Sequence, residues 1–343
     1  MPTMLHARRS LLLLTALAVF VPPLAACHSS SSSSTDAAAT DANHLMPLAT
    51  SPYGAGVFSS QVKSSSVDEG EQGAPRPLLV YYPDVAGSFP VVQVQHGFSA
   101  ANSSLATVNE FLAGHGFVVV APQMYPQGNP ADAPSIDDET QGVADVINWA
   151  KSNLEAVTGA NADIARYGLA GHSRGGQVAW RAALNNTNSV QALAGIDPVD
   201  GNAPPFDFDS DPFTVDPGPL VTDTALSFGF PTLILGTGLG PSEPFSCAPE
   251  GRNHEQFYAA SDRAFHLVAL DYGHNDMFDM NALESYACRS NPDRAPMQTF
   301  VGGQLVAYFS LRLADRDAQA YLLALSPAGE TQSPDIALDI ENK

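Results

Sequence analysis

The feature that most constrains this chain is a serine enclosed by glycines, Gly171-His172-Ser173-Arg174-Gly175-Gly176. An apolar run typical of a strand precedes it, and a run typical of a helix follows it from Gln177. A tight turn between a strand and a helix leaves no room for side chains beside the serine, which explains the glycines. Such a turn also raises the serine hydroxyl to the carboxyl end of the strand, beside a helix N-terminus. The pattern predicts a nucleophilic Ser173; the alternative is an ordinary glycine-rich turn with a passive serine.

Beyond this turn, apolar runs with strand character alternate with helical runs along the chain. The alternation predicts an α/β fold with a mainly parallel central sheet and helices on both faces, and the serine turn makes it an α/β-hydrolase fold. We place this domain at residues 51–318, followed by a C-terminal tail at 319–343. We predict strands at 53–61, 77–82, 90–97, 117–122, 164–170, 190–196, 230–236 and 265–270, and helices at 103–115, 136–156, 177–185, 254–260 and 296–314.

Candidate functional residues follow several of the predicted strands at their carboxyl ends. Ser173, Asp197, His274 and the His96-Gly97-Phe98 turn each lie at the end of a different strand. In open α/β sheets these strand ends share one edge, and ligands bind there. The sequence therefore directs chemically active residues from separate strands to one place.

A serine hydroxyl needs a base to take its proton, and in this fold the base comes late in the chain. Three histidines follow the serine: His254, His266 and His274. His266 lies within a predicted strand and His254 precedes that strand, whereas His274 comes just after it. We predict that His274 is the base; the alternative is that it is a surface-loop histidine.

The acid that orients the base is predicted at Asp197. Many α/β-hydrolases carry this acid after the strand that corresponds to 230–236, but the loop that follows here offers no aspartate before Asp262. The preceding strand, 190–196, ends directly in Asp197, whose role would be to orient His274 and stabilise its charged form. The alternatives are Asp200, Glu243 and Asp262, and an Asp-Pro pair is also a common start of a loop.

An oxyanion on the reacting carbonyl needs two N–H donors. One is expected from the residue after the nucleophile, Arg174, and the other from the loop after the third predicted strand, at Phe98. The alternatives are that His96-Gly97 is an ordinary turn at the end of a strand and that the Arg174 side chain forms a surface salt bridge.

The N-terminal segment has the pattern of a bacterial lipoprotein signal. Arg8 and Arg9 precede an apolar run at 11–20, and small residues then lead to Cys27. We predict a signal peptide at 1–26, lipidation of Cys27 and a flexible serine-rich and alanine-rich tether at 27–50. The protein would then be exported and anchored to a membrane by lipid, at the outer membrane or the cell surface. The alternative is an ordinary secretory signal, which would leave the protein secreted or periplasmic.

The remaining cysteines fit an exported protein. With Cys27 assigned to lipid, Cys247 and Cys288 remain, and an even number in an oxidising compartment suggests a disulfide. No cluster of residues has the spacing of metal ligands, and we expect neither a metal nor a cofactor. The formal net charge of −21 argues against nucleic acid as a partner, because phosphate binding needs basic surface.

Several motifs together resemble the chlorophyllase family. They occur in the family's order over about residues 75–313: the serine turn, Gly195-Ile196-Asp197-Pro198-Val199, Gly236-Thr237-Gly238-Leu239-Gly240, Cys247-Ala248-Pro249-Glu250-Gly251, Asn253-His254-Glu255, Asp271-Tyr272-Gly273-His274 and Phe300-Val301-Gly302-Gly303. Members of the family are α/β-hydrolases that cleave the phytyl ester of chlorophyll. The resemblance implies a serine esterase with Ser173, Asp197 and His274 as its triad, acting on a small-molecule or lipid-like ester.

Two other functions fit parts of the sequence. One is an exported lipase, cutinase or polyester hydrolase, and the other is a surface lipoprotein that binds ligands on a hydrolase scaffold without catalysis. The stretch 204–230 is rich in Phe and Pro and is a candidate lid or apolar substrate wall, with a plain covering loop as the alternative. Its candidate aromatic residues are Phe206, Phe208, Phe213 and Phe228.

Overall fold

The computed structural model describes residues 48–126, 133–159, 161–201, 219–221, 225–242, 246–279, 288–314, 321, 324–326, 334 and 336–343. The predicted signal peptide, the lipidation site Cys27 and nearly all of the tether lie outside these residues. So do Glu243 and most of the candidate lid at 204–230.

Within the described part of the chain, nine strands form one mixed sheet in the order β1-β2-β4-β3-β5-β6-β7-β8-β9. The six strands from β4 to β8 in this order run parallel, while β1, β2 and β9 pair antiparallel with their neighbours. The strands are β1 (Val62–Val67), β2 (Leu78–Pro83), β3 (Phe89–Gln95), β4 (Val118–Pro122), β5 (Ala162–His172), β6 (Ala192–Ile196), β7 (Thr232–Thr237), β8 (Ala264–Ala269) and β9 (Leu338–Asn342).

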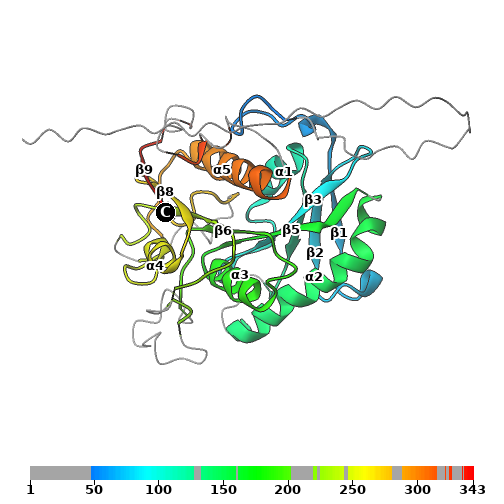
Figure 1. Ribbon diagram of the computed structural model, residues 1–343, viewed down its shortest axis with the longest axis horizontal. Coiled ribbons are helices and arrows are strands. Elements are labelled where there is room, and N and C mark those ends of the chain that lie inside the picture. Colours follow the sequence, from blue (N-terminus) through cyan, green and yellow to red (C-terminus); the bar gives the residue numbers. More distant parts are fainter. Residues whose placement is uncertain are drawn as a thin grey trace, which may run out of the picture. The chain divides into compact units, whose positions relative to one another are not determined.

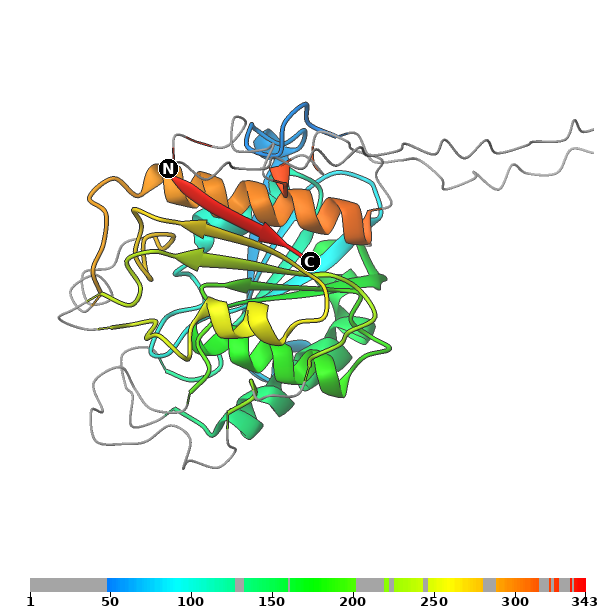
Figure 2. The same cartoon turned by 60° about the vertical axis from the view of Figure 1, so that its left-hand side comes forward.

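Helices cover both faces of this sheet, as the alternation of the sequence predicts (Figures 1 and 2). On one face α1 and α5 pack over the sheet, and on the other lie α2, α3 and α4. The central strands are buried on both sides, which explains the nearly continuous apolar run of β4. The helices are α1 (Ala106–Gly114), α2 (Ile136–Thr158), α3 (Arg174–Asn185), α4 (His254–Ala260) and α5 (Ala295–Leu313), and two short 3₁₀ helices are η1 (Ser59–Gln61) and η2 (Glu71–Gly73).

The turn between β5 and α3 is as tight as its glycines predict. A Cβ on Gly171 would lie 2.1 Å from the carbonyl oxygen of Gly175, and a Cβ on Gly175 would lie 2.3 Å from that of His96. Neither contact is possible for a real side chain. Ser173 has φ +55° and ψ −126°, a strained conformation for a residue other than glycine. The backbone of this turn therefore packs against the end of β3 as well as against its own helix.

The strand order reverses beside this turn. From β3 the chain passes through α1 to β4 on one side, and it then returns to form β5 on the other side of β3. Crevices at such a switch point, outside the carboxyl ends of the strands, are where ligands bind in open α/β sheets. The loop after β3 and the serine turn after β5 meet at this point.

The two edges of the sheet differ from the sequence prediction. The region predicted as a strand at 53–61 contains turns and η1, and the first strand instead lies at Val62–Val67. At the other edge, the predicted C-terminal tail contains β9, which pairs antiparallel with β8 and completes the sheet. Both strands are short and largely exposed, with three serines in β1 and charged residues in β9, so they lack the apolar pattern that identified the inner strands.

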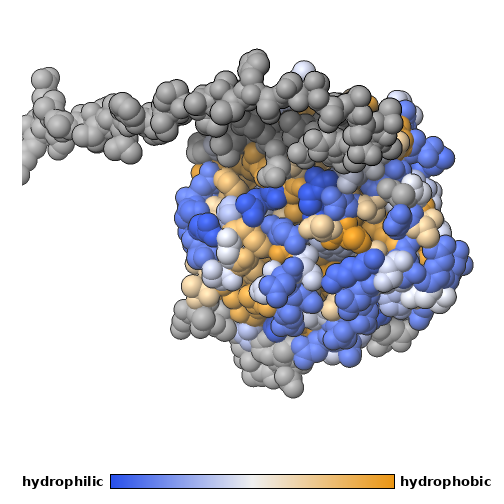
Figure 3. All heavy atoms as spheres, turned by 45° about the vertical axis from the view of Figure 1, so that its right-hand side comes forward, coloured by the Kyte–Doolittle hydropathy of each residue, from blue (hydrophilic) through white to orange (hydrophobic). Residues whose placement is uncertain are grey.

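The described surface is mainly polar, as in the face of the molecule that Figure 3 shows, where hydrophilic side chains are spread among apolar ones. Val57 and Leu270 are the large apolar side chains that are clearly exposed among the described residues. Of the helices that the structure describes, none combines the length and the apolar character that crossing a bilayer requires.

Candidate active site

Ser173 and His274 meet at the carboxyl edge of the sheet, although they are 101 residues apart in sequence. Ser173 is the N-cap of α3, and His274 lies in the loop after β8. The Nε2 atom of His274 is 2.8 Å from the Ser173 Oγ. The histidine is 4 % exposed, so its ring is held in the interior rather than on a surface loop. This geometry lets the imidazole accept the proton of the serine hydroxyl.

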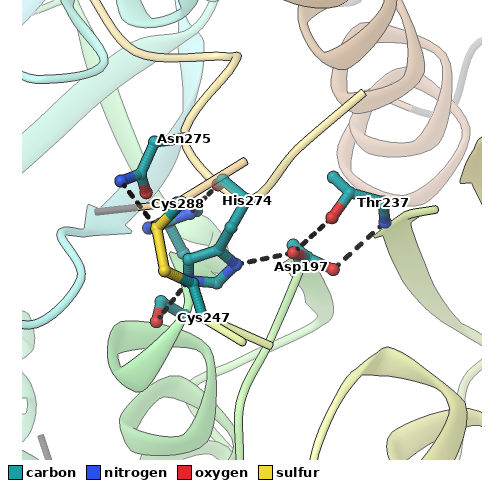
Figure 4. Close-up of a disulfide and its surroundings, with 8 residues drawn as sticks. Asp197, Thr237, Cys247, His274, Asn275 and Cys288 are labelled. Atoms are coloured by element: carbon teal, nitrogen blue, oxygen red, sulfur yellow. Dashed lines mark hydrogen bonds and ion pairs between the residues drawn. A yellow bond between two sulfur atoms is a disulfide. The ribbon is translucent and has the colours of Figure 1, made fainter. Parts of the chain in front are cut away.

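Asp197 lies on the other side of the same imidazole. Its Oδ2 is 2.6 Å from His274 Nδ1, and the carboxylate is completely buried at the end of β6. Thr237, at the end of β7, donates its backbone N–H to Oδ1 (3.1 Å) and its hydroxyl to Oδ2 (2.7 Å). Figure 4 shows Asp197 between His274 and Thr237. A carboxylate only accepts hydrogen bonds, so His274 Nδ1 carries a proton and Nε2 is free to accept one from the serine.

The environment of Asp197 keeps it ionised. Burial alone would raise the pKa of Asp197, but the hydrogen bond and charge of His274, the charge of His254 and the Thr237 hydroxyl together lower it below its ordinary value. The chain therefore holds a buried negative charge beside the imidazole of His274, which contacts Ser173.

Two of the alternative acids, Asp200 and Asp262, make hydrogen bonds elsewhere. Asp200 accepts the side-chain amide of Gln177 (2.7 Å) and the backbone N–H groups of Leu220 (3.0 Å) and Val221 (2.7 Å), and it thereby holds the loop after β6. Asp262 lies on the surface and accepts the Ser227 hydroxyl. Glu243 lies outside the described residues.

The other two histidines after the serine pair with each other. His254 Nδ1 is 2.8 Å from His266 Nε2, on the side of the sheet where α4 packs. Neither of them contacts Ser173 among the hydrogen bonds of the described residues. The structure thus brings Ser173, Asp197 and His274 together, whereas Asp200, Asp262, His254 and His266 make other contacts.

Two residues that hold His274 were missed by the sequence analysis. His172 donates from Nε2 to the carbonyl oxygen of His274 at 2.7 Å, and the two rings lie 4.5 Å apart. Burial lowers the pKa of His172 to about 3, so this ring stays neutral. Asp276 accepts the backbone N–H groups of Gly273 (2.6 Å) and Asn291 (2.7 Å) and so closes the loop around His274. His172 lies inside the serine motif and Asp276 lies two residues after His274. Only the folded structure shows what these two side chains contact.

The loop after β3 lies directly against Ser173. A Cβ on Gly97 would come within 3.1 Å of the Ser173 Cβ and 2.7 Å of the His172 ring. Phe98 follows on this loop, and Arg174 follows the serine. Within the described part of the chain, the backbone N–H groups of Phe98 and Arg174 are not engaged in a hydrogen bond. Both groups are free to meet an acceptor near Ser173.

The Arg174 side chain is buried rather than on the surface. It is 8 % exposed and forms a salt bridge with Glu139 of α2 at 2.6 Å, and Nη2 also donates to the Pro134 carbonyl. Its guanidinium lies over the Phe98 ring, 5.8 Å from the ring centre. One cation therefore connects α2, the serine turn and the loop after β3. The alternative of a surface salt bridge for Arg174 is wrong, because this ion pair is buried.

A disulfide joins Cys247 and Cys288, as the cysteine count predicts, with Cα atoms 5.7 Å apart. It links the loop after β7 to the segment that follows His274. The Asn275 amide, next to His274 in sequence, contacts the Cys288 sulfur at 3.3 Å. Figure 4 shows the disulfide beside His274 and Asp197. The bond therefore restrains the part of the chain that carries His274.

Three apolar side chains in the described part of the candidate lid, Leu226, Phe228 and Phe230, are buried. Phe228 is 9 % exposed, and its ring makes an edge contact with Trp180 of α3 at 6.3 Å. This residue contributes to the core rather than to a mobile cover. Phe206, Phe208 and Phe213 lie outside the described residues.

Comparison with known proteins places this chain in a family. The chlorophyllase family model matches residues 48–336, which is most of the chain. The chain belongs to the chlorophyllase family. It is 35 % identical over 302 residues to the chloroplastic Chlorophyllase-1 of Citrus unshiu, a match that covers 83 % of this chain and 87 % of that protein. It is 33 % identical over 302 residues to Chlorophyllase-1 of Arabidopsis thaliana, covering 81 % of this chain and 90 % of that protein.

Membership of the chlorophyllase family settles the general class of this chain. Chlorophyllases are ester hydrolases, and this family member is an ester hydrolase of the α/β-hydrolase type. The resemblance found in the sequence motifs is thereby confirmed. A binding protein without catalysis, the alternative from another class, does not fit this membership.

We expect the disulfide of this chlorophyllase family member to stabilise the fold. Replacing both Cys247 and Cys288 with serine opens a link across 41 residues. The free energy of unfolding should fall by about 4 kcal/mol, because the unfolded chain regains the entropy of that loop. Urea unfolding followed by circular dichroism measures the change.

Cys27→Ser is the matched control for this experiment, because it removes a cysteine that the disulfide does not use. It should leave the unfolding midpoint unchanged, and a reductant should lower the midpoint of the wild type but not that of the double variant. Equal midpoints for the wild type and the double variant would contradict the expectation.

Proposed function

We propose that this protein is a serine carboxylic-ester hydrolase in which Ser173 is the nucleophile, His274 the general base and Asp197 the orienting acid. The observation that carries the proposal is the continuous hydrogen-bond chain from the Ser173 hydroxyl through both ring nitrogens of His274 to the buried Asp197 carboxylate. A serine with a base within 2.8 Å, and an acid on the far side of that base, has the arrangement that nucleophilic catalysis needs.

The reaction that we propose has two acyl-transfer steps. His274 takes the proton of Ser173 as the hydroxyl oxygen attacks the ester carbonyl, and the N–H groups of Phe98 and Arg174 hold the negative oxygen that forms. His274 then gives the proton to the departing alcohol, which leaves an acyl-enzyme. Water attacks this ester with the same base, and the acid product and Ser173 are released. Asp197 stays ionised throughout and stabilises the charged imidazole.

Two features support an apolar ester as the substrate. The relatives named above are chlorophyllases, and the sequence motifs resemble that family, whose members cleave the phytyl ester of chlorophyll. We therefore propose a chlorophyllase-like activity on esters with a long apolar group. An exported lipase, cutinase or polyester hydrolase is the second candidate, and it is favoured by the lipoprotein-like N-terminal sequence.

The role of Ser173 can be tested with p-nitrophenyl butyrate. Wild type should release p-nitrophenol, and Ser173→Ala should lower kcat by a factor on the order of 10⁴ or more, because no nucleophile remains. The exposed Ser227, which hydrogen-bonds Asp262, provides the matched control Ser227→Ala with unchanged kcat. An inert wild type, or a Ser173→Ala variant as active as the wild type, contradicts the proposed mechanism.

The substrate class can be tested with a panel of esters. Chlorophyll a should be cleaved to phytol and chlorophyllide, with a higher kcat/KM than a triglyceride or a soluble polyester, and each activity should disappear in Ser173→Ala. Chromatography of the released phytol is the measurement. Fast hydrolysis of the triglyceride or polyester without phytol release would support the second candidate instead.

We propose further that the protein is exported and attached to a membrane by lipid at Cys27. The sequence before Cys27 supports export, and so does the disulfide between Cys247 and Cys288, because disulfides persist in oxidising compartments. In a bacterium fed an alkyne-labelled fatty acid, the wild type should carry the label and sediment with membranes. Cys27→Ser should lose both properties, and the Cys247→Ser/Cys288→Ser variant should keep the label. Equal labelling with and without Cys27 would contradict lipidation.

A further inference from the structure

The loop that carries Phe98 is held by one buried tyrosine. Tyr125 follows β4 and is 5 % exposed. Its hydroxyl accepts the backbone N–H of Ser99 at 3.0 Å and donates to the carbonyl oxygen of Gly97 at 3.3 Å. The same phenol therefore contacts the peptide units on both sides of Phe98. Ser99, the residue that this contact restrains, has a positive φ of +59°.

A second donor reaches the same carbonyl oxygen. His96 Nδ1 is 2.8 Å from the Gly97 oxygen, and its Nε2 accepts the backbone N–H of Met124 at 3.0 Å. Because Nε2 accepts, the proton of the neutral ring is on Nδ1, where it is donated to Gly97. Burial lowers the pKa of His96 to about 4, in agreement with a neutral ring at physiological pH.

The hydrogen bonds to the Gly97 carbonyl determine the direction of the Phe98 N–H. In a trans peptide the carbonyl of Gly97 and the N–H of Phe98 belong to one plane and point in opposite directions. With the carbonyl turned toward Tyr125 and His96, the N–H of Phe98 is turned away from both. It is not engaged in a hydrogen bond within the described residues, and the adjoining Gly97 packs against the Ser173 Cβ.

The geometry points to Tyr125 as a positioning residue that, together with His96, holds the Gly97–Phe98 peptide with its N–H toward the oxyanion at Ser173. This inference rests on the proposed function, because it explains how the Phe98 N–H, one of the two donors in the proposed reaction, is oriented. Tyr125 does not touch the reacting atoms. Without its hydroxyl the peptide can rotate, and the carbonyl oxygen of Gly97 can then face the position of the oxyanion and repel it.

Tyr125→Phe removes the hydroxyl and keeps the ring that packs near His96 and Phe98. We expect kcat for p-nitrophenyl butyrate to fall about 10- to 100-fold, somewhat less than the loss of a whole oxyanion donor, with KM within about threefold of the wild type. Purely structural damage would not separate kcat from KM in this way.

The affinity for a transition-state mimic gives a more direct measurement. An alkyl trifluoromethyl ketone of matching length forms a hemiketal with Ser173 and places its oxygen where the oxyanion forms, whereas the corresponding ether cannot. In Tyr125→Phe the inhibition constant of the ketone should rise by the same factor by which kcat/KM falls. The affinity for the ether should stay within about twofold of the wild type.

Tyr167→Phe is the matched control. Tyr167 is a buried tyrosine of β5 whose hydroxyl donates to Gln93 at 2.6 Å, away from the loop after β3. Loss of the Tyr167 hydroxyl should lower the melting temperature without changing kcat or the affinity for the ketone.

If Tyr125→Phe does not fold, His96→Gln provides the test. The amide oxygen of the glutamine can accept the Met124 N–H, while the donor to the Gly97 carbonyl is lost. This variant should show the same separation of kcat from KM.

The outcomes separate the inference from the proposed function. An inert wild type contradicts both. An active wild type, together with a folded Tyr125→Phe variant that has the kcat and ketone affinity of the wild type, overturns only the role of Tyr125. Equal losses of affinity for the ketone and the ether also overturn it, because they indicate general damage to the site. A loss confined to kcat and to the affinity for the ketone supports the role of Tyr125.

Discussion

The close contact of backbone with backbone at the serine turn is the constraint on which the rest of the structure depends. With a Cβ at Gly171 only 2.1 Å from the Gly175 oxygen, and one at Gly175 only 2.3 Å from the His96 oxygen, glycine is the residue that fits. This contact presses α3 against the ends of β5 and β3. It forces Ser173 into a positive φ and brings the loop after β3 against this residue. The backbone strain is therefore concentrated at the proposed nucleophile.

A buried charge organises the other half of the site. Asp197 also has a positive φ, and it is completely buried, so its carboxylate must be satisfied from within the protein. Thr237 supplies two hydrogen bonds and His274 supplies a third. Thr237 comes from the end of β7, which pairs with β6, and His274 comes from the loop after β8. The proposed acid lies after β6, one strand earlier than in many α/β-hydrolases, and β7 contributes the threonine that completes its hydrogen bonding.

The loop that carries His274 is restrained from several directions. His172 holds its carbonyl, Asp276 holds the N–H of Gly273, and the disulfide of Cys288 joins the segment to the loop after β7. On the opposite side of the serine, Tyr125 and His96 restrain the loop of Phe98. The groups proposed to act on an ester are thus held by neutral or paired neighbours, which suits a site whose hydrogen bonds must be in place before the charge develops.

The sequence by itself determined the fold class and directed Ser173, Asp197 and His274 to one edge of the sheet, where the structure brings them together. It could do so because glycine spacing, buried parallel strands and strand ends are local patterns. The even number of cysteines left after Cys27 separately predicted the disulfide. Only the tertiary structure decided the polar edge strands β1 and β9, the burial of Arg174 against Glu139, and the contacts of His172, Asp276 and Tyr125. These features have no local signature. The Tyr125 hydroxyl contacts Ser99 and Gly97, which are 26 and 28 residues away in sequence. These contacts form because β3 and β4 are neighbours in the folded sheet.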